Sequence, residues 1–242
     1  YNLTGVQDAS STTCSRLLTA SVTVTVRPLP SATISGTTSI CQSGTSPVIT
    51  FTGSGGTAPY IFTYNINGGV TQTITTTTGN STTVTVSTST AGVFTYNLVS
   101  VRYGSSPVCS QPQTGSATIT INPSPIATLT GNTTVCLNDT QPIVTFTGSG
   151  GTAPYTFTYN INGGTPKTVT TTTGNSVTVS VPTSTAGTFT YNLTGVQDSA
   201  TPSCTKPQTG SVIITVKSLP TATISGTTTI CQGGTSPFIT FT

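Results

Sequence analysis

Tyr60-Ile61-Phe62-Thr63-Tyr64-Asn65-Ile66-Asn67 carries the clearest strand pattern in the sequence. Large apolar side chains stand at every second position of this stretch, and mostly polar side chains stand between them. This period of two is expected of a half-buried β-strand. Because Phe94-Thr95-Tyr96-Asn97-Leu98 repeats the pattern, we expect two strands whose aromatic and aliphatic faces meet in a core between two sheets.

The surrounding segment, 30–124, contains seven stretches typical of strands. Gly- and Asn-rich turns separate them, and no stretch has helical periodicity. Seven strands in 95 residues is the count of an immunoglobulin-like (Ig-like) sandwich. The predicted fold class is therefore all-β, with tandem Ig-like antiparallel β-sandwich domains. We predict strands near 32–36, 47–53, 60–67, 71–78, 82–87, 93–102 and 116–121, and hairpin turns at 67–69 and 79–80.

The same unit returns every 95 residues. A period this long that keeps its register indicates one small domain copied in tandem, an arrangement that usually does mechanical or spacing work rather than chemistry. The copies are nearly verbatim, since 52–60 returns as 147–155. The cysteines follow the same step: Cys14, Cys109 and Cys204 form one series, and Cys41, Cys136 and Cys231 form the other.

Proline-containing stretches mark the borders between copies, at 27–30, 122–125 and 217–220. We expect the chain to be part of a much longer protein. Its predicted domains are the C-terminal part of a preceding Ig-like repeat (1–29), two complete repeats (30–124 and 125–219) and the N-terminal part of a following repeat (220–242).

Charged side chains make up only 4% of the sequence, against roughly 25% in ordinary soluble domains. The net charge of +3 is too weak, and the basic residues are too scattered, to attract nucleic acid or an anionic membrane. No apolar run approaches the ~20 residues of a membrane helix. We therefore expect no nucleic-acid partner and no membrane insertion within this segment.

The six cysteines are the main candidate site. The sequence has no His and no close cysteine pair that could begin a zinc site, so disulfides are favoured over a metal. In an Ig topology the early Cys41 and the late Cys109 lie at opposite poles, more than about 20 Å apart. A disulfide needs Cα atoms within about 7 Å, whereas the poles of neighbouring copies touch.

We therefore predict an inter-repeat disulfide between Cys41 and Cys204. The alternative is a bond within each repeat, Cys41 with Cys109 and Cys136 with Cys204. Cys14 and Cys231 would then pair outside this sequence. Either kind of bond suits an oxidising exterior.

No catalytic group emerges from the sequence. The many Ser and Thr residues lack a His or Lys base, so nucleophilic catalysis has no partner. The only acidic residues, Asp8, Asp139 and Asp198, are too few for a calcium site. We predict that the chain is not an enzyme and has no catalytic residue, cofactor or metal.

Several sequence elements together carry a family resemblance. They resemble the tandem Ig-like repeats of giant surface adhesins and appendage proteins of gliding Bacteroidota, and the resemblance covers the whole chain. It implies export by a type IX secretion system and an extracellular life at the cell surface. Many relatives have an acidic residue and a Gly before the late cysteine, whereas Pro107-Val108 and Pro202-Ser203 stand there in this chain. The elements are 30–36, Cys41, 55–60, 91–94 and Cys109, with equivalents 95 residues on.

Asp198-Ser199-Ala200 fits the short Asp-Ser/Thr-aliphatic pattern to which Bacteroidota attach O-glycans. Ser199 is therefore a candidate O-glycosylation site.

The favoured function is a structural shaft of an extracellular filament or giant adhesin, used for attachment, gliding or cell capture. Exposed strand edges are normally guarded by charges, and the Thr-rich stretches 73–78 and 168–173 have none. We therefore expect lateral association of identical chains into a homo-oligomeric fibre. The alternatives are a module that binds glycans or cell surfaces through the variable loops 101–108 and 196–203, or a passive spacer carrying a distal functional head.

Overall fold

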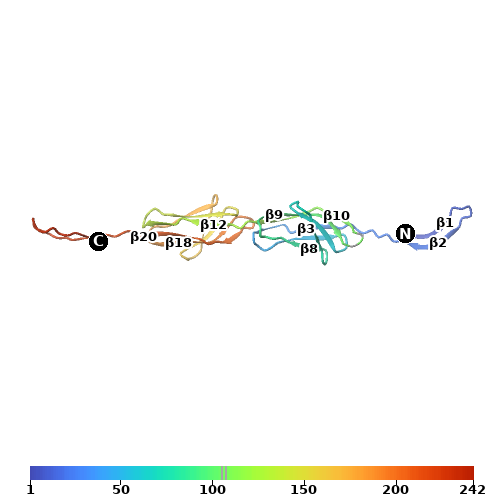
Figure 1. The fold of residues 1–242 in the computed structure, drawn as a ribbon, viewed down its shortest axis with the longest axis horizontal. Coiled ribbons are helices and arrows are strands. Elements are labelled where there is room, and N and C mark those ends of the chain that lie inside the picture. The colour runs from blue at the N-terminus through green and yellow to red at the C-terminus, as the bar shows by residue number, and fades with distance from the viewer. Residues whose placement is uncertain (105, 107) are drawn as a thin grey trace. The chain divides into compact units, whose positions relative to one another are not determined.

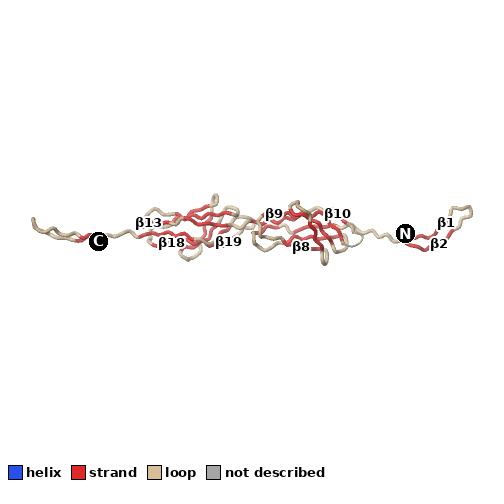
Figure 2. Tube along the Cα trace, viewed as in Figure 1, coloured by secondary structure: helices blue, strands red, loops and turns tan. Residues whose placement is uncertain are grey.

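A computed structural model describes residues 1–104, 106 and 108–242. The described residues form strands, turns and loops, and Figure 2 shows no helix among them. In this part of the chain, accordingly, no helix is long and apolar enough to cross a membrane. Contacts divide the chain into two compact units. The first comprises Tyr1–Thr38, Thr45–Ser87 and Val93–Thr120, and the second comprises Ser39–Gly44, Thr88–Gly92 and Ile121–Thr242.

The segment 30–124 forms two sheets, several strands of which are labelled in Figure 1. The smaller sheet has the order β3-β5-β8, with β3 at Ser31–Ser35, β5 at Val48–Ser54 and β8 at Ser81–Thr85. The larger sheet has the order β4-β11-β9-β6-β7, with β10 paired to β9. Its strands are β4 (Thr38–Cys41), β6 (Tyr60–Ile66), β7 (Gln72–Thr75), β9 (Gly92–Tyr103), β10 (Ser110–Pro112) and β11 (Ser116–Asn122).

The segment 125–219 repeats this topology. Its smaller sheet consists of β12 (Ile126–Thr130), β14 (Ile143–Ser149) and β17 (Ser176–Ser180). Its larger sheet has the order β13-β20-β18-β15-β16, with β19 paired to β18. These strands are β13 (Thr133–Cys136), β15 (Thr156–Ile161), β16 (Lys167–Thr170), β18 (Gly187–Gln197), β19 (Thr205–Pro207) and β20 (Ser211–Lys217).

The chain thus contains Ig-like β-sandwiches, and each of the seven strands expected in 30–124 is present within a few residues of its predicted position. Two short strands in each copy were not predicted, β4 and β10 in the first and β13 and β19 in the second. We expected purely antiparallel sheets. This expectation is wrong for the larger sheet of the second copy, because β13 pairs with β20 in parallel.

The two predicted hairpin turns have different outcomes. The turn at 67–69 joins the antiparallel pair β6 and β7, with Asn67 at φ 52° and Gly68 at φ 73°. The hairpin predicted at 79–80 is wrong, because β7 and β8 belong to different sheets. Gly79 has a φ of 68°, so the glycine marks a tight turn, and that turn carries the chain from one sheet to the other.

Aromatic rings from the two sheets meet in the core of each copy. Phe51 of the smaller sheet lies 5.6 Å from Phe62 and 5.0 Å from Tyr64, both on β6, measured between ring centroids. The second copy repeats this packing, with Phe146 5.6 Å from Phe157 on β15. The alternating pattern of 60–67 therefore places its aromatic residues in the core, as predicted.

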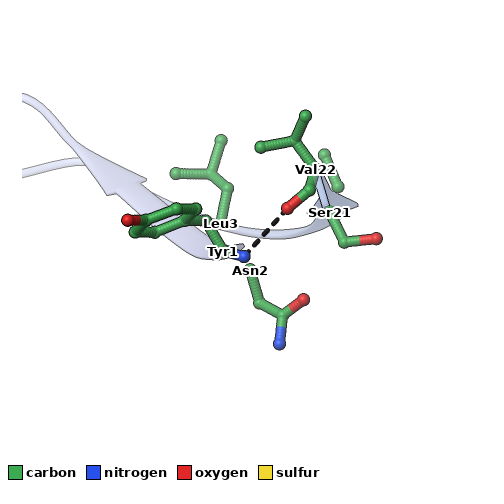
Figure 3. Close-up of a pocket in the computed structure, with 6 residues that line it drawn as sticks. Tyr1, Asn2, Leu3, Ser21 and Val22 are labelled. Carbon is green, nitrogen blue, oxygen red and sulfur yellow. Dashed lines mark hydrogen bonds between the residues drawn. The ribbon is translucent and has the colours of Figure 1, made fainter. Parts of the chain in front are cut away.

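β1 (Asn2–Gln7) has the same sequence as 192–197 and forms a hairpin with β2 (Ser15–Ser21). Tyr1 and Leu3 are 89% and 51% exposed, whereas the residues 190 positions on, Tyr191 and Leu193, are 2% and 3% exposed. Tyr1, Leu3 and Val22 line the cavity drawn in Figure 3, where the N-terminal amine donates to the Val22 carbonyl at 2.8 Å.

A second short hairpin pairs β21 (Ile224–Ser225) with β22 (Thr240–Phe241).

Candidate functional site: the Cys41–Cys204 disulfide

A disulfide joins Cys41 at the end of β4 to Cys204 just before β19. Their Cα atoms are 5.6 Å apart, within the range that such a bond requires. The two residues are separated by 163 positions, so the bond links the predicted repeats 30–124 and 125–219. This is one of the two pairings that the sequence left open. Because each sulfur forms one such bond, Cys41–Cys109 and Cys136–Cys204 are not formed in this structure.

The loop that carries Cys41 is held by a hydrogen bond within it and by two hydrogen bonds to Thr88. The Gly44 amide donates to the Cys41 carbonyl at 3.0 Å, which closes a turn around the cysteine. Ser43 has a φ of 63° and its amide donates to the Thr88 carbonyl at 2.9 Å, while the Thr88 hydroxyl donates to the Gly44 carbonyl at 2.8 Å. The sulfur of Cys41 is therefore presented from a loop braced against 88–92.

Polar groups connect this loop to the loop that carries Cys204. The Gln42 amide donates to the Asn122 carbonyl at 2.8 Å. The Asn122 side-chain amide in turn lies 3.2 Å from the carbonyls of both Thr201 and Pro202. All of these residues belong to the second compact unit, so the disulfide is supported there by neighbouring hydrogen bonds.

A buried carboxylate organises the loop that contains Cys204. Asp198 is 4% exposed and Cys204 is 1% exposed. Asp198 accepts hydrogen bonds from the backbone amides of Cys204 at 2.7 Å, Thr152 at 3.1 Å and Ala200 at 3.3 Å. Hydrogen bonds to an ionised acceptor are stronger than neutral ones. A side chain at Gly151 would overlap the carboxylate, so the glycine allows this loop to close over it.

The other two acidic residues are also bonded to a cysteine amide. The Cys14 amide donates to the Asp8 carboxylate at 3.0 Å, and the Cys136 amide donates to the Asp139 carboxylate at 3.0 Å. The hydrogen bond from the Cys14 amide, with a second from the Ser10 hydroxyl, lowers the pKa of Asp8 below its ordinary value of 3.8. All three acidic residues of the sequence therefore fix the backbone next to a cysteine.

This role of the acidic residues was not predicted, although the sequence contains a signal for it. Asp8 stands six positions before Cys14, as Asp198 stands six before Cys204. Among the described residues, no group of three or more His, Cys, Asp or Glu side chains is arranged to hold a metal ion.

The first complete repeat has Tyr103 at the position of Asp198. Tyr103 is 1% exposed and its ring lies where a side chain on Gly56 would be. Its hydroxyl donates to the Pro28 carbonyl at 3.3 Å, and a hydrogen bond with Cys109 raises the pKa of Tyr103. Of the variable loop 101–108, Ser105 and Pro107 lie outside the described residues.

The remaining candidate residues are placed as follows. Cys14, Cys136 and Cys231 are exposed thiols. Ser199 is exposed, and its hydroxyl is within donating distance of the carbonyls of Ala153 (2.7 Å) and Thr152 (3.1 Å). O-glycosylation of Ser199 remains a prediction.

No model of a protein family matches this sequence, and no curated protein is similar to it at a significant level. Among solved structures, the chain is similar to a Ca²⁺-stabilised adhesin with which an Antarctic bacterium reaches out and binds ice, with 21% identity and a TM-score of 0.46 over 92% of this chain. This chain spans 58% of the length of that structure.

Two further solved structures are similar over most of this chain. A 1.5-MDa bacterial ice-binding adhesin is 17% identical, with a TM-score of 0.42 over 83% of this chain and 69% of the other. Invasin, a bacterial integrin-binding protein, is 13% identical, with a TM-score of 0.34 over 82% of this chain and 42% of the other. The likeness in shape is partial in all three cases. The topology and the disulfide themselves define an all-β protein of Ig-like tandem repeats.

Proposed function

We propose that this chain is part of the shaft of an extracellular filament or giant surface adhesin, in which successive Ig-like copies carry tension. The disulfide between Cys41 and Cys204 is the observation that carries the proposal. Tension applied between the two ends of the chain passes from Cys41 to Cys204 through the sulfur atoms. It therefore bypasses residues 42–203, which contain most of both sandwiches.

The size of this effect is large. An extended residue spans about 3.4 Å, so residues 42–203 would add about 550 Å of contour length if the chain were pulled out. The strands within residues 42–203 are shielded in this way from the load that the chain bears. A disulfide of this kind persists in an oxidising environment, which supports a location outside the cell, at its surface.

A force–extension measurement on the whole chain, held at its two ends, tests this function. The oxidised chain should extend only through the residues outside 41–204, and a reductant should release about 550 Å more. The Cys204→Ser variant should extend fully without reductant. Equal extension of the oxidised and reduced wild-type chains would contradict a shaft built on this bond.

The finer role rests on the sequence resemblance. The elements at 30–36, 55–60 and 91–94 resemble those of giant surface proteins of gliding Bacteroidota, and this resemblance supports export by a type IX secretion system. Under that proposal the shaft serves attachment, gliding or the capture of other cells. Loss of the protein from the surface of a type IX secretion mutant of the source cell is the expected result, and unchanged surface display would contradict this route.

Lateral association of identical chains is the second part of the proposal. The outward side chains of β3, β5 and β8 carry hydroxyl groups in register across the sheet, with hydrogen bonds between Thr52 and Ser81 and between Ser31 and Ser54. No charge opposes the approach of a second such face. The stretch 73–78 contributes less than expected, because Thr76 is buried and its hydroxyl accepts a hydrogen bond from the Tyr60 amide.

Electron cryomicroscopy of native material tests this association. Several chains side by side would support a fibre, and isolated single chains would contradict it.

A glycan- or surface-binding module is the competing function. The loop 196–203 is the candidate binding loop of such a module. The side chains of Asp198 and Ser199 in this loop are already hydrogen-bonded to the backbone of the chain itself. This loop is organised around Cys204 rather than directed at a ligand, which favours a shaft or a spacer. Binding of the chain to a glycan panel at micromolar concentration, abolished by substitutions in 196–203, would reverse that preference.

A further inference from the structure

Cys136 occupies in 125–219 the position that Cys41 occupies in 30–124, and its loop has the same conformation. The Asp139 amide donates to the Cys136 carbonyl at 3.1 Å, as the Gly44 amide donates to the Cys41 carbonyl at 3.0 Å. One of these cysteines is in a disulfide and the other is an exposed thiol. The loop conformation is therefore the same with and without the bond.

The hydrogen bonds that hold the loops around Cys41 and Cys136 are also equivalent. Asn138 has a φ of 66° where Ser43 has 63°, and both amides donate at 2.9 Å to a threonine carbonyl, that of Thr183 or Thr88. The Thr183 and Thr88 hydroxyls each return a hydrogen bond to their loop, at 2.7 Å and 2.8 Å. The loop around Cys136 is thus already shaped to hold a disulfide.

The complementary half of such a bond is present at Cys14. The Cys14 amide donates to Asp8 at 3.0 Å, and the Asp8 amide donates to the Cys14 carbonyl at 3.1 Å. The Asp198–Cys204 pair makes the same two hydrogen bonds, at 2.7 Å and 3.0 Å. Cys14 is exposed, so its thiol is open to a partner.

A side-chain donor beside the Cys41–Cys204 disulfide has an equivalent near Cys136. Asn122 donates to the carbonyls of the loop that carries Cys204, and its own carbonyl accepts the Gln42 amide at 2.8 Å. Lys217 stands at the equivalent position of the next copy, and its carbonyl accepts the Leu137 amide at 2.8 Å. The Lys217 ammonium can donate to the carbonyls of an arriving loop as the Asn122 amide does.

We propose that Cys136 forms a disulfide with the late cysteine of another copy of this repeat, in the register of Cys41–Cys204. In a second copy of this chain, Cys14 holds that late position. The proposal rests on the proposed function and names the partner that continues the same crosslink.

This register gives the shaft two interleaved covalent paths. Cys14 and Cys41 are 27 positions apart, and so are Cys204 and Cys231. Tension along one path therefore crosses only about 27 residues of backbone between successive bonds. The first path runs through the Cys41–Cys204 bond. Cys136 lies inside the loop which that bond closes, so its bond belongs to the second path. If a bond of one path breaks, the other path stays connected.

Forming the bond requires a disulfide oxidant, for which glutathione disulfide is the probe. The Cys136 thiolate attacks glutathione disulfide and releases one glutathione thiolate. The Cys14 thiolate of the second chain then attacks the Cys136 sulfur and displaces the other. Two protein thiols and one glutathione disulfide give one protein disulfide and two glutathione molecules, so the atoms and electrons balance.

The test mixes two full-length chains that each keep one reactive thiol besides the Cys41–Cys204 bond. The first keeps Cys136 and carries Cys14→Ser, Cys109→Ser and Cys231→Ser. The second keeps Cys14 and carries Cys109→Ser, Cys136→Ser and Cys231→Ser. In a glutathione redox buffer, we expect at least tenfold more heterodimer than either homodimer, quantified by mass spectrometry of disulfide-linked peptides.

The matched control replaces the second chain with one that keeps only Cys231, an exposed thiol of the early series. This pair should give the statistical twofold excess of heterodimer. Lys217→Ala in the Cys136 chain, or Asp8→Ala in the Cys14 chain, should lower the heterodimer yield severalfold. A heterodimer share for Cys136 and Cys14 that equals the control would overturn the proposal.

The same digest reports the Cys41–Cys204 bond in every chain. If that bond is intact and the heterodimer is absent, the Cys136 pairing fails and the proposed shaft stands. If the Cys41–Cys204 bond is itself absent, the proposed function fails as well.

Discussion

Residues 96–109 and 191–204 are equivalent segments of the two complete repeats, and they differ most at a single buried position. Tyr103 fills the space under Gly56 with a ring, whereas Asp198 fills the space under Gly151 with a carboxylate. The ring offers one hydroxyl to the Pro28 carbonyl. The carboxylate accepts three backbone amides, one of which belongs to the bonded Cys204.

The same scaffold therefore carries two differently built loops. The cores of the two copies match, as the Phe51–Phe62 and Phe146–Phe157 pairs show. In the second copy, hydrogen bonds from backbone amides to the Asp198 carboxylate fix the loop that carries Cys204. In the first copy, the Tyr103 ring packs in the equivalent space. Substitutions in the core should therefore affect both copies alike, while substitutions in the loops should separate them.

Removal of the disulfide should have the largest effect. In the chain-entropy account, a crosslink that closes a loop of this length stabilises the folded state by about 5 kcal/mol. The Cys41→Ser and Cys204→Ser double variant should lose that much free energy of unfolding, measured by urea denaturation followed by circular dichroism. The Cys14→Ser variant, which removes an exposed thiol, should match the wild type.

Core substitutions should come next, and they test the likeness of the copies. Phe62→Ala and Phe157→Ala each remove a fully buried ring from equivalent positions of β6 and β15. Each should cost about 4 kcal/mol of unfolding free energy in its own copy. A difference of more than about 2 kcal/mol between the two variants in the same urea experiment would show that the cores are not equivalent.

The loop position should separate the copies more modestly. Asp198→Ala leaves buried amides without their acceptor and should cost about 3 kcal/mol, whereas Tyr103→Phe removes one hydroxyl and should cost about 1 kcal/mol or less. Asp198→Asn keeps one acceptor oxygen and should fall between them. Equal losses for Asp198→Ala and Tyr103→Phe would remove the distinction drawn between the two loops.

The smallest effect concerns the exposed counterpart of Asp198. Hydrogen bonds to its ionised form hold the pKa of Asp8 below 3.8, so the closed loop is favoured above that pH. The stabilisation is lost as the pH falls through the lowered pKa. Titration of the Asp8 carboxyl by NMR should give a midpoint below 3.8, with the Cys14 amide shift changing at the same pH. A midpoint at or above 3.8 would mean that the hydrogen bond does not favour the carboxylate in solution.

The sequence was sufficient for the main strands, because alternating patterns such as 60–67 are long and bounded by glycine turns. It did not reveal β4 or β13, which are four-residue strands at the sheet edge. Their pairing partners lie about 80 positions away, so no local pattern records them. The 79–80 turn was misread for a similar reason, since a turn glycine indicates a reversal of the chain and not which sheet follows.

The site was predictable only in part. The expected distance between the two ends of a sandwich favoured a disulfide between Cys41 and Cys204. The sequence alone could not exclude disulfides within each repeat, because it does not show how far the loops fold back. The roles of Asp8, Asp139 and Asp198 depend on backbone amides that fold back towards them. Side-chain identity alone shows acidic residues that are too few for a metal, and it does not show which amides they accept.

Peptide mapping of the unreduced protein distinguishes the Cys41–Cys204 disulfide from bonds within the repeats. Cleavage after Arg16, Arg102, Lys167 and Lys217 separates Cys41 (17–102) and Cys204 (168–217) from a peptide that holds both Cys109 and Cys136 (103–167). We expect peptide 17–102 to be linked to peptide 168–217, and neither of them to be linked to peptide 103–167. Peptide 103–167 linked to both of the others would instead show bonds within the repeats, and it would contradict the shaft built on Cys41 and Cys204.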